Sequence, residues 1–346
     1  MLSCFLSPLF FLWRITFPPR RRLVRVYLNH AVLLVLGMIF LANPAAAAAA
    51  PDASAINVKA TTVPLDSADW SAEIAGQLRY RGGVHLTSPN ERFGGLSGLI
   101  VSADGQQFTA VSDGGTWTSG ALTYDADGNL SGVADVTIEP IRGADGRPLK
   151  GARGDAESLA FAANDELVVA FERDPKLLAY LNGRDRPVVL DPPDGIDRAP
   201  GNRGMEAMTR LSDGRLLIVA EYDEEPGKFA GWIGNDGSWS RVTYLCDQGY
   251  VPTGATTLAN GDVVFVERRF PLLSIRVRQV PAAAIKPGAE IEAEELARLE
   301  GSRSFDNMEG IAMRQGPGGE TLIYLVSDDN FRSFQRTLLM MFELQR

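Results

Sequence analysis

Residues 203–223, RGMEAMTRLSDGRLLIVAEYD, carry the pattern that decides the fold. Apolar segments flank Asp213-Gly214, and an Asp-Gly pair between apolar segments is the strongest short-range signal for a β-hairpin. Folding the chain at this turn brings Glu206 opposite Glu221 at the open end of two paired strands. Like charges placed opposite each other destabilise a hairpin. The pair therefore needs an explanation beyond packing.

The same pattern occurs five times along the chain. Each copy has a polar residue before a small apolar pair, then a turn, then an apolar strand that ends in Glu or Ser. The leading positions are Ser97, Glu157, Glu206, Thr253 and Glu309, and the closing positions are Ser112, Glu172, Glu221, Glu267 and Ser327. In each copy the two positions are equidistant from a turn. This spacing predicts that they are cross-strand neighbours at the open end of a hairpin.

The repeat length indicates an all-β propeller. Successive leading positions are 60, 49, 47 and 56 residues apart, which is the range for four-stranded blades around a central channel. We predict six blades, the sixth assembled from residues 75–86 and 337–345; five or seven blades and a solenoid are the alternatives. The acidic stretch 289–299 is predicted to be a helical insert between blades.

The first fifty residues differ from the rest. They contain five arginines and no acidic residue, followed by an apolar run at 31–41 and an alanine-rich segment. This is the pattern of a secretory signal, so residues 1–50 are predicted to be a signal peptide or, if uncleaved, a membrane anchor. Residues 51–75 would be a linker and 76–346 the propeller. We expect a periplasmic or secreted bacterial protein, monomeric because a single-chain propeller closes on itself.

Charge and composition limit the partners. Without residues 1–50 the chain keeps 29 basic and 43 acidic side chains, a net charge of about −14. This disfavours nucleic acid or an anionic membrane surface and favours cations and small molecules. Only Cys246 and His85 would remain of their residue types, which excludes an internal disulfide and a zinc site built on several histidines.

Radial repetition would place the repeated polar residues in one ring at the channel mouth. The ring contains Glu157, Glu172, Glu206, Glu221, Glu267 and Glu309. The residues just after the closing positions are Asp113, Arg173, Tyr222, Arg268 and Asp328, and Asp155 and Asp306 stand just before two of the leading glutamates. Acidic and basic side chains are almost never fully buried unless they are paired. Such a convergence therefore points to a bound ligand or to a network of ion pairs.

The chain resembles the phytase-like propellers, a family described by an esterase-like activity of phytase. The similarity covers residues 94–344 and rests on GGLSGL and SDGG, DAESLAF, RGMEAM with DGRLLIVAE, and DNMEGIA with SDDNF. The resemblance implies an exported β-propeller with acidic repeat residues that hydrolyses phosphate esters or phosphodiesters. The motifs of the calcium-dependent β-propeller phytases are not found residue by residue.

Two interpretations of the ring follow. In the functional one, Glu172, Glu221, Glu267, Asp113 and Asp328 bind metal, with Ca²⁺ the first candidate because it takes oxygen ligands. Glu157, Glu206 and Glu309 then serve as catalytic bases or further ligands. Arg173, Arg268, Ser97 and Ser112 bind the substrate, a small molecule with or without a phosphate group. In the structural interpretation, the same glutamates form ion pairs that hold the blades together.

Three functions are compatible with these residues. The first is a metal-dependent hydrolase of phosphate esters. The second is an esterase or lactonase that acts on non-phosphate substrates with the same scaffold. The third is a propeller that binds a ligand or an envelope partner without catalysis. Loss of activity on chelation would separate the first two from the third, and a substrate panel would separate the first from the second.

Overall fold

The computed structural model describes residues 52–162, 166–181, 183–200 and 203–345. The predicted signal segment, residues 1–50, lies outside this part of the chain. The described residues belong to one compact unit, residues 49–346. No helix in the described ranges is long and apolar enough to cross a membrane.

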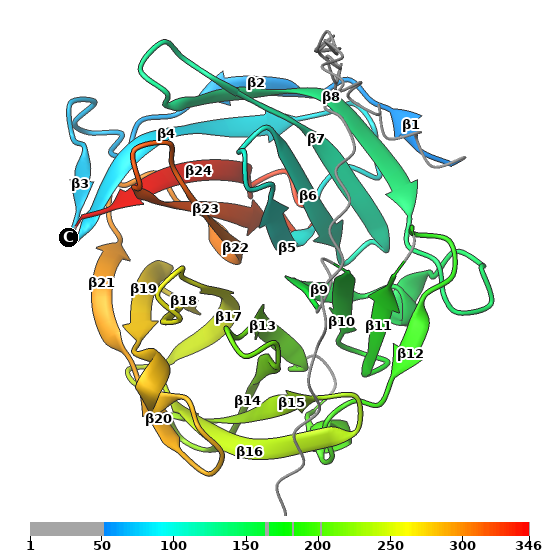
Figure 1. The fold of residues 1–346 in the computed structure, drawn as a ribbon. Helices are drawn as coiled ribbons and strands as arrows, with labels where there is room; N and C mark the ends of the chain where they lie inside the picture. The colour runs from blue at the N-terminus through cyan, green and yellow to red at the C-terminus, as the bar shows by residue number, and fades with distance from the viewer. Residues whose placement is uncertain (1–51, 163–165, 182, 201–202, 346) are drawn as a thin grey trace, which may run out of the picture. The chain divides into compact units, whose positions relative to one another are not determined.

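Five sheets, numbered here as blades 1 to 5, are arranged around a centre (Figure 1). Blade 1 has the order β1 (Ser54–Ala55), β8 (Leu130–Pro140), β7 (Thr116–Tyr124), β6 (Gln107–Ser112) and β5 (Leu96–Val101). Blade 2 has the order β12 (Val188–Leu190), β11 (Lys176–Tyr180), β10 (Leu167–Phe171) and β9 (Ala156–Phe161). Blade 3 has the order β13 (Met205–Arg210), β14 (Leu216–Glu225), β15 (Lys228–Asn235), β16 (Ser238–Leu245) and β20 (Glu290–Glu292).

The last two blades complete the ring. Blade 4 has the order β17 (Tyr250–Thr257), β18 (Val263–Arg269), β19 (Ser274–Val280) and β21 (Glu294–Leu299). Blade 5 has the order β2 (Lys59–Thr62), β4 (Leu78–Thr87), β24 (Thr337–Leu344), β23 (Thr321–Asp328) and β22 (Asn307–Gln315), with β3 (Ile74–Ala75) beside β4. Short 3₁₀ helices span Gly151–Arg153, Ile196–Arg198 and Ala282–Ala284. The inner strands β5, β9, β13, β17 and β22 contact one another in sequence, and β22 contacts β5. The chain is therefore an all-β propeller.

The prediction of six blades was wrong, since the described residues form five. The early strand β4 and the last strand β24 do pair with each other, as expected, but they are the outer strands of blade 5 rather than a separate blade. A hairpin repeat supplies only two strands, so β22 and β23 need these two partners to make a full sheet. The fifth repeat and the closing strands are thus one blade.

Two further expectations about secondary structure were wrong. Part of the predicted linker, residues 51–75, forms strands: β1 pairs with β8 and β2 with β4, so the propeller begins before residue 76. The predicted helix at 289–299 is β20 and β21, which pair with β16 and β19. Pairing with an exposed sheet edge overrides the helical propensity of its glutamates and alanines.

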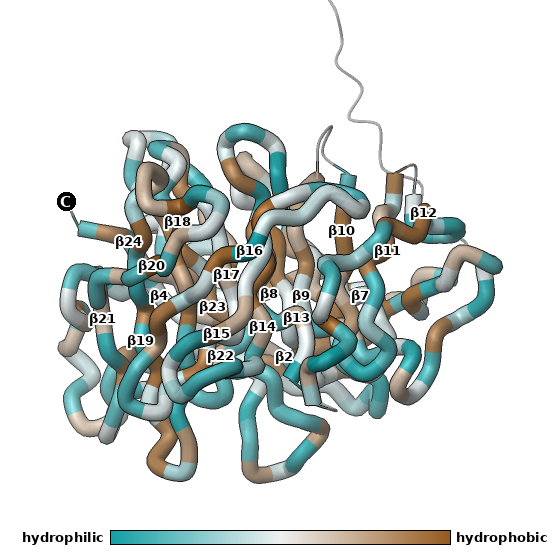
Figure 2. Tube along the Cα trace, turned by 90° about the horizontal axis from the view of Figure 1, so that it is seen from below, coloured by the Kyte–Doolittle hydropathy of each residue, from teal (hydrophilic) through white to brown (hydrophobic). Residues whose placement is uncertain are grey.

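Turns and core follow the expected chemistry. Gly214 and Gly261, in two of the predicted turns, have φ of +88° and +90°, a conformation that glycine adopts without strain. Figure 2 shows hydrophilic residues on most of the loops at the ends of the strands. Farther along the inner strands, an apolar pocket of about 240 Å³ is lined by residues that include Leu99, Leu159 and Ile311. Polar positions at one end of these strands thus adjoin an apolar interior.

Candidate functional site

Each inner strand has a β-bulge at its leading polar position. In blade 3, for example, Met205 pairs with Ala220 and Ala207 pairs with Val219, so the pairing passes over Glu206. The residues passed over in the five blades are Ser97, Glu157, Glu206, Thr253 and Glu309. A bulge re-aims a side chain and is over-represented next to active sites. The repeated motif is therefore a repeated bulge.

The second strand of each hairpin carries another set of equivalent positions next to the bulge. The residues that pair immediately before the bulges are Ser112, Phe171, Ala220, Glu267 and Ser327, and the residues after them are Asp113, Glu172, Glu221, Arg268 and Asp328. The closing residue of each hairpin was predicted from its distance to the turn. In blades 1, 4 and 5 this gave the residue that pairs before the bulge, and in blades 2 and 3 it gave the residue after that one. Adjacent residues of a strand face opposite sides, so Glu267 is not equivalent to Glu172 or Glu221.

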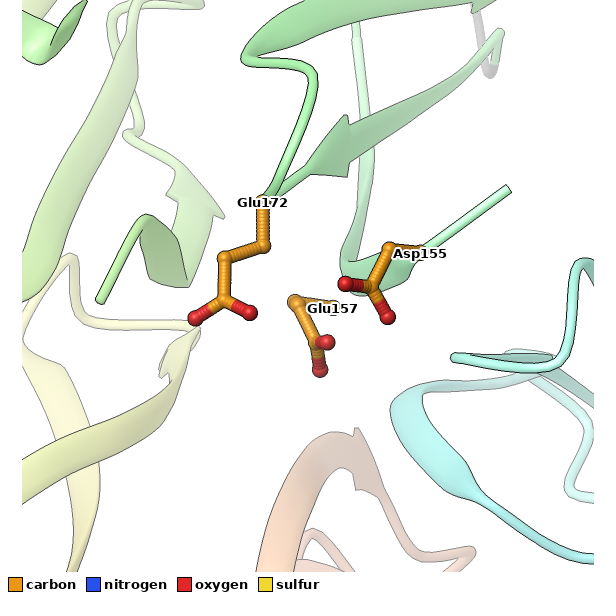
Figure 3. A group of neighbouring side chains, drawn as sticks. All are labelled: Asp155, Glu157 and Glu172. Carbon is orange, nitrogen blue, oxygen red and sulfur yellow. The ribbon is translucent and has the colours of Figure 1, made fainter. Parts of the chain in front are cut away.

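Five acidic side chains from blades 2 and 3 converge, and we call them the carboxylate cluster: Asp155, Glu157, Glu172, Glu206 and Glu221. Oxygens of Asp155, Glu157 and Glu172 lie within 4.8 Å of one another, and so do those of Glu172, Glu206 and Glu221. Figure 3 shows the first three side chains directed toward a common space. Glu172 belongs to both groups and joins the two blades.

The two bulge glutamates of the cluster are buried without a basic partner. Glu157 and Glu206 are 8% and 3% exposed, and within the described ranges neither forms an ion pair with a lysine, arginine or histidine. Burial raises the pKa of both carboxyls well above the usual range, and the neighbouring glutamates raise it further. Ionising them costs free energy unless a cation compensates.

Arg268 occupies the position in blade 4 that Asp113, Glu172, Glu221 and Asp328 occupy elsewhere. Its guanidinium pairs with Glu221 at 3.1 Å and with Glu309, and it donates a hydrogen bond to the side-chain oxygen Oδ1 of Asn307 at 2.7 Å. Burial alone would lower the pKa of Arg268, but Glu309 and Glu221 raise it, so the side chain stays charged. This predicted substrate ligand is already held by two acids.

Two further aspartates, Asp113 in blade 1 and Asp328 in blade 5, lie outside the carboxylate cluster. Burial raises the pKa of Asp113 to about 7 and that of Asp328 to about 9, and the charge on Glu309 adds to both shifts. Asp328 accepts a hydrogen bond from Asn307 Nδ2 at 3.4 Å, and Glu309 accepts one from the same amide at 2.8 Å. Neither Asp113 nor Asp328 joins a group of three potential metal ligands in the described residues.

The remaining predicted substrate ligands have other partners. Arg173 Nε lies 2.9 Å from Asp155 Oδ2, with 56% of its side chain exposed. Ser112 is fully buried and donates to the Gly94 carbonyl at 2.8 Å. Ser97, at its bulge, is also buried. Arg173 is thus the one of the three that solvent reaches readily.

The structure separates Glu267 from the other ring residues. Its side chain is fully buried, pairs with Arg276 and with Arg278, and accepts a hydrogen bond from Tyr244 Oη at 2.6 Å. Tyr244 is in blade 3, so the group links two blades. For Glu267, assigned to a metal site from its spacing, the structural interpretation of the ring holds.

Asn307 was missed in the sequence, although a signal was present. Asn307 lies two residues before the bulge at Glu309, as Asp155 lies two residues before the bulge at Glu157. Residues two apart on a strand share a face, so both reach the mouth. Asp306, by contrast, accepts hydrogen bonds from Arg336.

Comparisons with known proteins identify the family. No curated protein matches the chain significantly. Among solved structures, virginiamycin B lyase from Staphylococcus aureus, an inactive variant bound to quinupristin, is 13% identical with a TM-score of 0.43, covering 83% of this chain and 100% of that one. The major allergen Mala s 1 of Malassezia sympodialis is 15% identical with a TM-score of 0.41, covering 85% and 96%. The family model described as "Phytase-like: Esterase-like activity of phytase" matches residues 91–331. The chain belongs to this phytase-like family.

Proposed function

We propose that this propeller is a divalent-cation-dependent hydrolase of phosphate esters, with Ca²⁺ as the first candidate ion. The observation that carries the proposal is the sharing of Glu172 by two groups of three carboxylates whose oxygens lie within 4.8 Å. Carboxylate oxygens are the ligands that Ca²⁺ prefers. Glu157 and Glu206 are buried with no basic partner in the described ranges, so the residues present fit a cation.

The carboxylate cluster would hold the ion or ions. Bound Ca²⁺ supplies positive charge that stabilises the negative charge developing on a phosphoryl group. Arg268, fixed by Glu221 and Glu309, would orient a phosphoryl oxygen at the edge of the cluster, since a guanidinium matches phosphate geometry. Arg173 is exposed and would contact the outer part of the substrate.

Asp113 is the candidate for proton transfer. Its pKa of about 7 lies near neutral pH, where a carboxyl group can both accept and release a proton, and such transfer typically contributes 10²–10⁴-fold to a rate. Asp113 lies outside the two groups of potential ligands. A cation bound by those groups therefore leaves Asp113 free to transfer a proton. Asp113 Oδ1 would take the proton from the attacking water as the water oxygen bonds to phosphorus. The ester P–O bond would break in the same displacement, and the departing oxygen would take a proton from solvent to leave as the alcohol.

A second candidate is an esterase or lactonase that acts on uncharged carboxylic esters. One observation favours it: both arginines at the mouth are already paired with acids, Arg173 with Asp155 and Arg268 with Glu221 and Glu309. A site with few free positive charges attracts a polyanionic substrate weakly. The same cluster and Asp113 would serve this reaction, so only the substrate distinguishes the two.

Thermal unfolding tests the cation site. The protein, stripped with a chelator, would be titrated with Ca²⁺ for wild type, Glu206→Gln and the control Glu224→Gln. Glu224 follows on the same strand, β14, but forms an exposed ion pair with Arg241. Saturation at about 100 times Kd stabilises a protein by about 2.7 kcal/mol, which we expect in wild type and the control and not in Glu206→Gln. An unchanged melting temperature in wild type would overturn the proposal.

Activity separates the two candidates. The Ca²⁺-loaded protein would be assayed with p-nitrophenyl phosphate, bis(p-nitrophenyl) phosphate and p-nitrophenyl acetate. We expect hydrolysis of a phosphate ester that stops on chelation and returns with Ca²⁺. Hydrolysis of the acetate alone would favour the second candidate. Ca²⁺ binding without any hydrolysis would assign the cluster to ligand binding or to stability.

A further inference from the structure

The loop between β23 and β24 contains two strained residues in succession. Asn330 and Phe331 have φ of +48° and +51°. Asparagine tolerates this left-handed conformation, but for a bulky residue such as phenylalanine it is a genuine outlier. Conformations of this kind persist only where the surroundings hold them, and they cluster at binding sites.

Hydrogen bonds fix the loop to blade 1. Asp329 Oδ1 accepts from the backbone N–H of Phe331 at 3.0 Å and from that of Gly95 at 2.9 Å, and Asp329 Oδ2 accepts from Thr337 Oγ1 at 2.9 Å. Asp328 Oδ1 accepts from the N–H of Asn330 at 2.6 Å. The loop is therefore anchored on both sides of Phe331.

The ring of Phe331 lies beside Asp113, over two glycines. A Cβ added to Gly95 would lie 2.6 Å from Phe331 Cε2 and 1.9 Å from Asp113 Oδ1, and one added to Gly114 would lie 3.0 Å from Phe331 Cζ. Only glycine leaves this space for the ring. Phe331 is nevertheless 46% exposed, so one part of the ring packs on the glycines and another part is open to solvent.

The exposed part of Phe331 borders a space large enough for a substrate group. Phe331 lines a pocket of about 540 Å³ together with His85, Arg332 and Arg336, a volume within the usual range for a small-molecule site. Asp113 contacts the same space beside Gly95 as the ring does but is not among the residues that line this pocket. On the neighbouring blade, Phe270 is 54% exposed and its ring lies 5.9 Å from the guanidinium carbon of Arg268. Exposed aromatic rings thus accompany two of the charged mouth residues.

We propose that Phe331 is a specificity-determining residue: its rigid ring forms a wall against which the flat, aromatic leaving group of the ester stacks while the reacting group faces Asp113. This inference rests on the proposed function of the same site. It predicts a preference for aryl esters over esters of polyols, because a hydroxylated leaving group gains little from an aromatic face and the mouth arginines are already paired with acids.

Equilibrium binding tests the wall without requiring turnover. Phenylphosphonate and methylphosphonate, which are not hydrolysed, would be titrated by calorimetry into the full chain loaded with Ca²⁺. Aromatic pairing is worth about 0.5–1.5 kcal/mol, so we expect wild type to bind phenylphosphonate about 2- to 13-fold more tightly. Phe331→Ala should remove the difference while keeping the affinity for methylphosphonate.

Two further variants control for folding. Phe331→Gly removes the ring and also the strain at this φ, so it should fold at least as well as wild type and still lose the preference. Phe161→Ala removes an exposed phenylalanine at the far end of inner strand β9, and it should keep the preference. Equal binding of the two phosphonates by wild type, or a preference that survives in Phe331→Gly, would overturn the inference.

The outcomes also separate this inference from the proposed function. A preference for phenylphosphonate in a protein that hydrolyses no ester would support stacking on Phe331 and contradict the proposed hydrolase activity. Hydrolysis of phenyl phosphate and glycerol phosphate with equal kcat/KM would support the hydrolase activity and contradict stacking of the leaving group on Phe331. Failure of both phosphonates to bind would reject both.

Discussion

Glu206 and Glu221 lie at the open end of one hairpin, β13–β14, with carboxylate oxygens within 4.8 Å of each other and of Glu172. The arrangement results from a bulge at Glu206 and from the position of Glu221, which directly follows Ala220, the last residue of β14 that pairs with β13. Arg268 pairs with Glu221 but not with Glu206 in the described structure. One of the two opposed glutamates therefore has a built-in partner, and the other is left for a cation.

Without a cation, the stability of the protein should fall as the pH rises. In the folded state Asp113 and Asp328 have a pKa of about 7 and about 9 against an ordinary 3.8, and burial also raises the pKa of Glu157 and Glu206. The folded protein thus binds more protons than the unfolded chain between about pH 4 and pH 9. The free energy of unfolding is therefore highest below pH 4 and falls through this window. It falls by about 1.4 kcal/mol per pH unit for each proton that only the folded state binds.

Calcium should reverse this trend, because the ion binds deprotonated carboxylates. Denaturant unfolding at pH 5, 7 and 9, in chelator and in excess Ca²⁺, measures both effects. We expect the stabilisation by Ca²⁺ to grow with pH. A chelated protein that is more stable at pH 9 than at pH 5 would contradict the described electrostatics.

Replacing Arg268 should destabilise the fold strongly. Arg268→Met leaves Glu309 and Glu221 without their cation in a buried setting, and breaking a buried pair by removing one partner costs about 3–5 kcal/mol. Arg241→Met removes an exposed pair with Glu224 and should cost less than about 1 kcal/mol. Chemical denaturation of both variants in chelator provides the comparison.

Added Ca²⁺ should partly rescue Arg268→Met, because the freed glutamates become additional oxygen ligands. Equal stability of Arg268→Met and Arg241→Met would show that the buried network contributes nothing to folding.

Glu267→Gln should reduce stability without affecting calcium. The substitution leaves buried Arg276 and Arg278 without the carboxylate that joins them, at a cost of about 3 kcal/mol. Because Glu267 faces the side of its strand opposite to Arg268, the Kd for Ca²⁺ should match that of wild type. Unfolding measures the first effect and calcium titration at low temperature the second. A tenfold weaker Kd would place Glu267 back among the ligands.

Asp113→Asn should slow catalysis by about 10²–10⁴-fold, the usual contribution of general acid–base chemistry. The asparagine keeps the shape beside Gly95 and Phe331 but cannot accept the proton. The acidic limb of the pH–rate profile, expected near pH 7 from the pKa of Asp113, should disappear. Ca²⁺ binding should be unchanged, and a loss of binding would make Asp113 a ligand instead.

Repetition is what the sequence revealed well. Five copies of a polar residue, a turn and an apolar strand were sufficient to predict a propeller and to locate the leading polar positions, because a hairpin is a local structure whose signals lie within about twenty residues. The phytase-like family was also identifiable from these repeats. The association of residues 75–86 with residues 337–345 was predicted from the need to close the ring, although their place in blade 5 was not.

The tertiary structure decided the register and the partners. A bulge adds one residue to a strand without altering local composition, so spacing alone could not distinguish Glu267, which faces the core, from Glu221, which faces the mouth. The edge strand at 294–299 has helical composition and becomes a strand only because β19 offers it an unpaired edge. Likewise, Arg268 and Glu309 are in different blades, and only ring closure brings their opposite charges together. The sequence determined which residues recur, and the fold decided which of them meet.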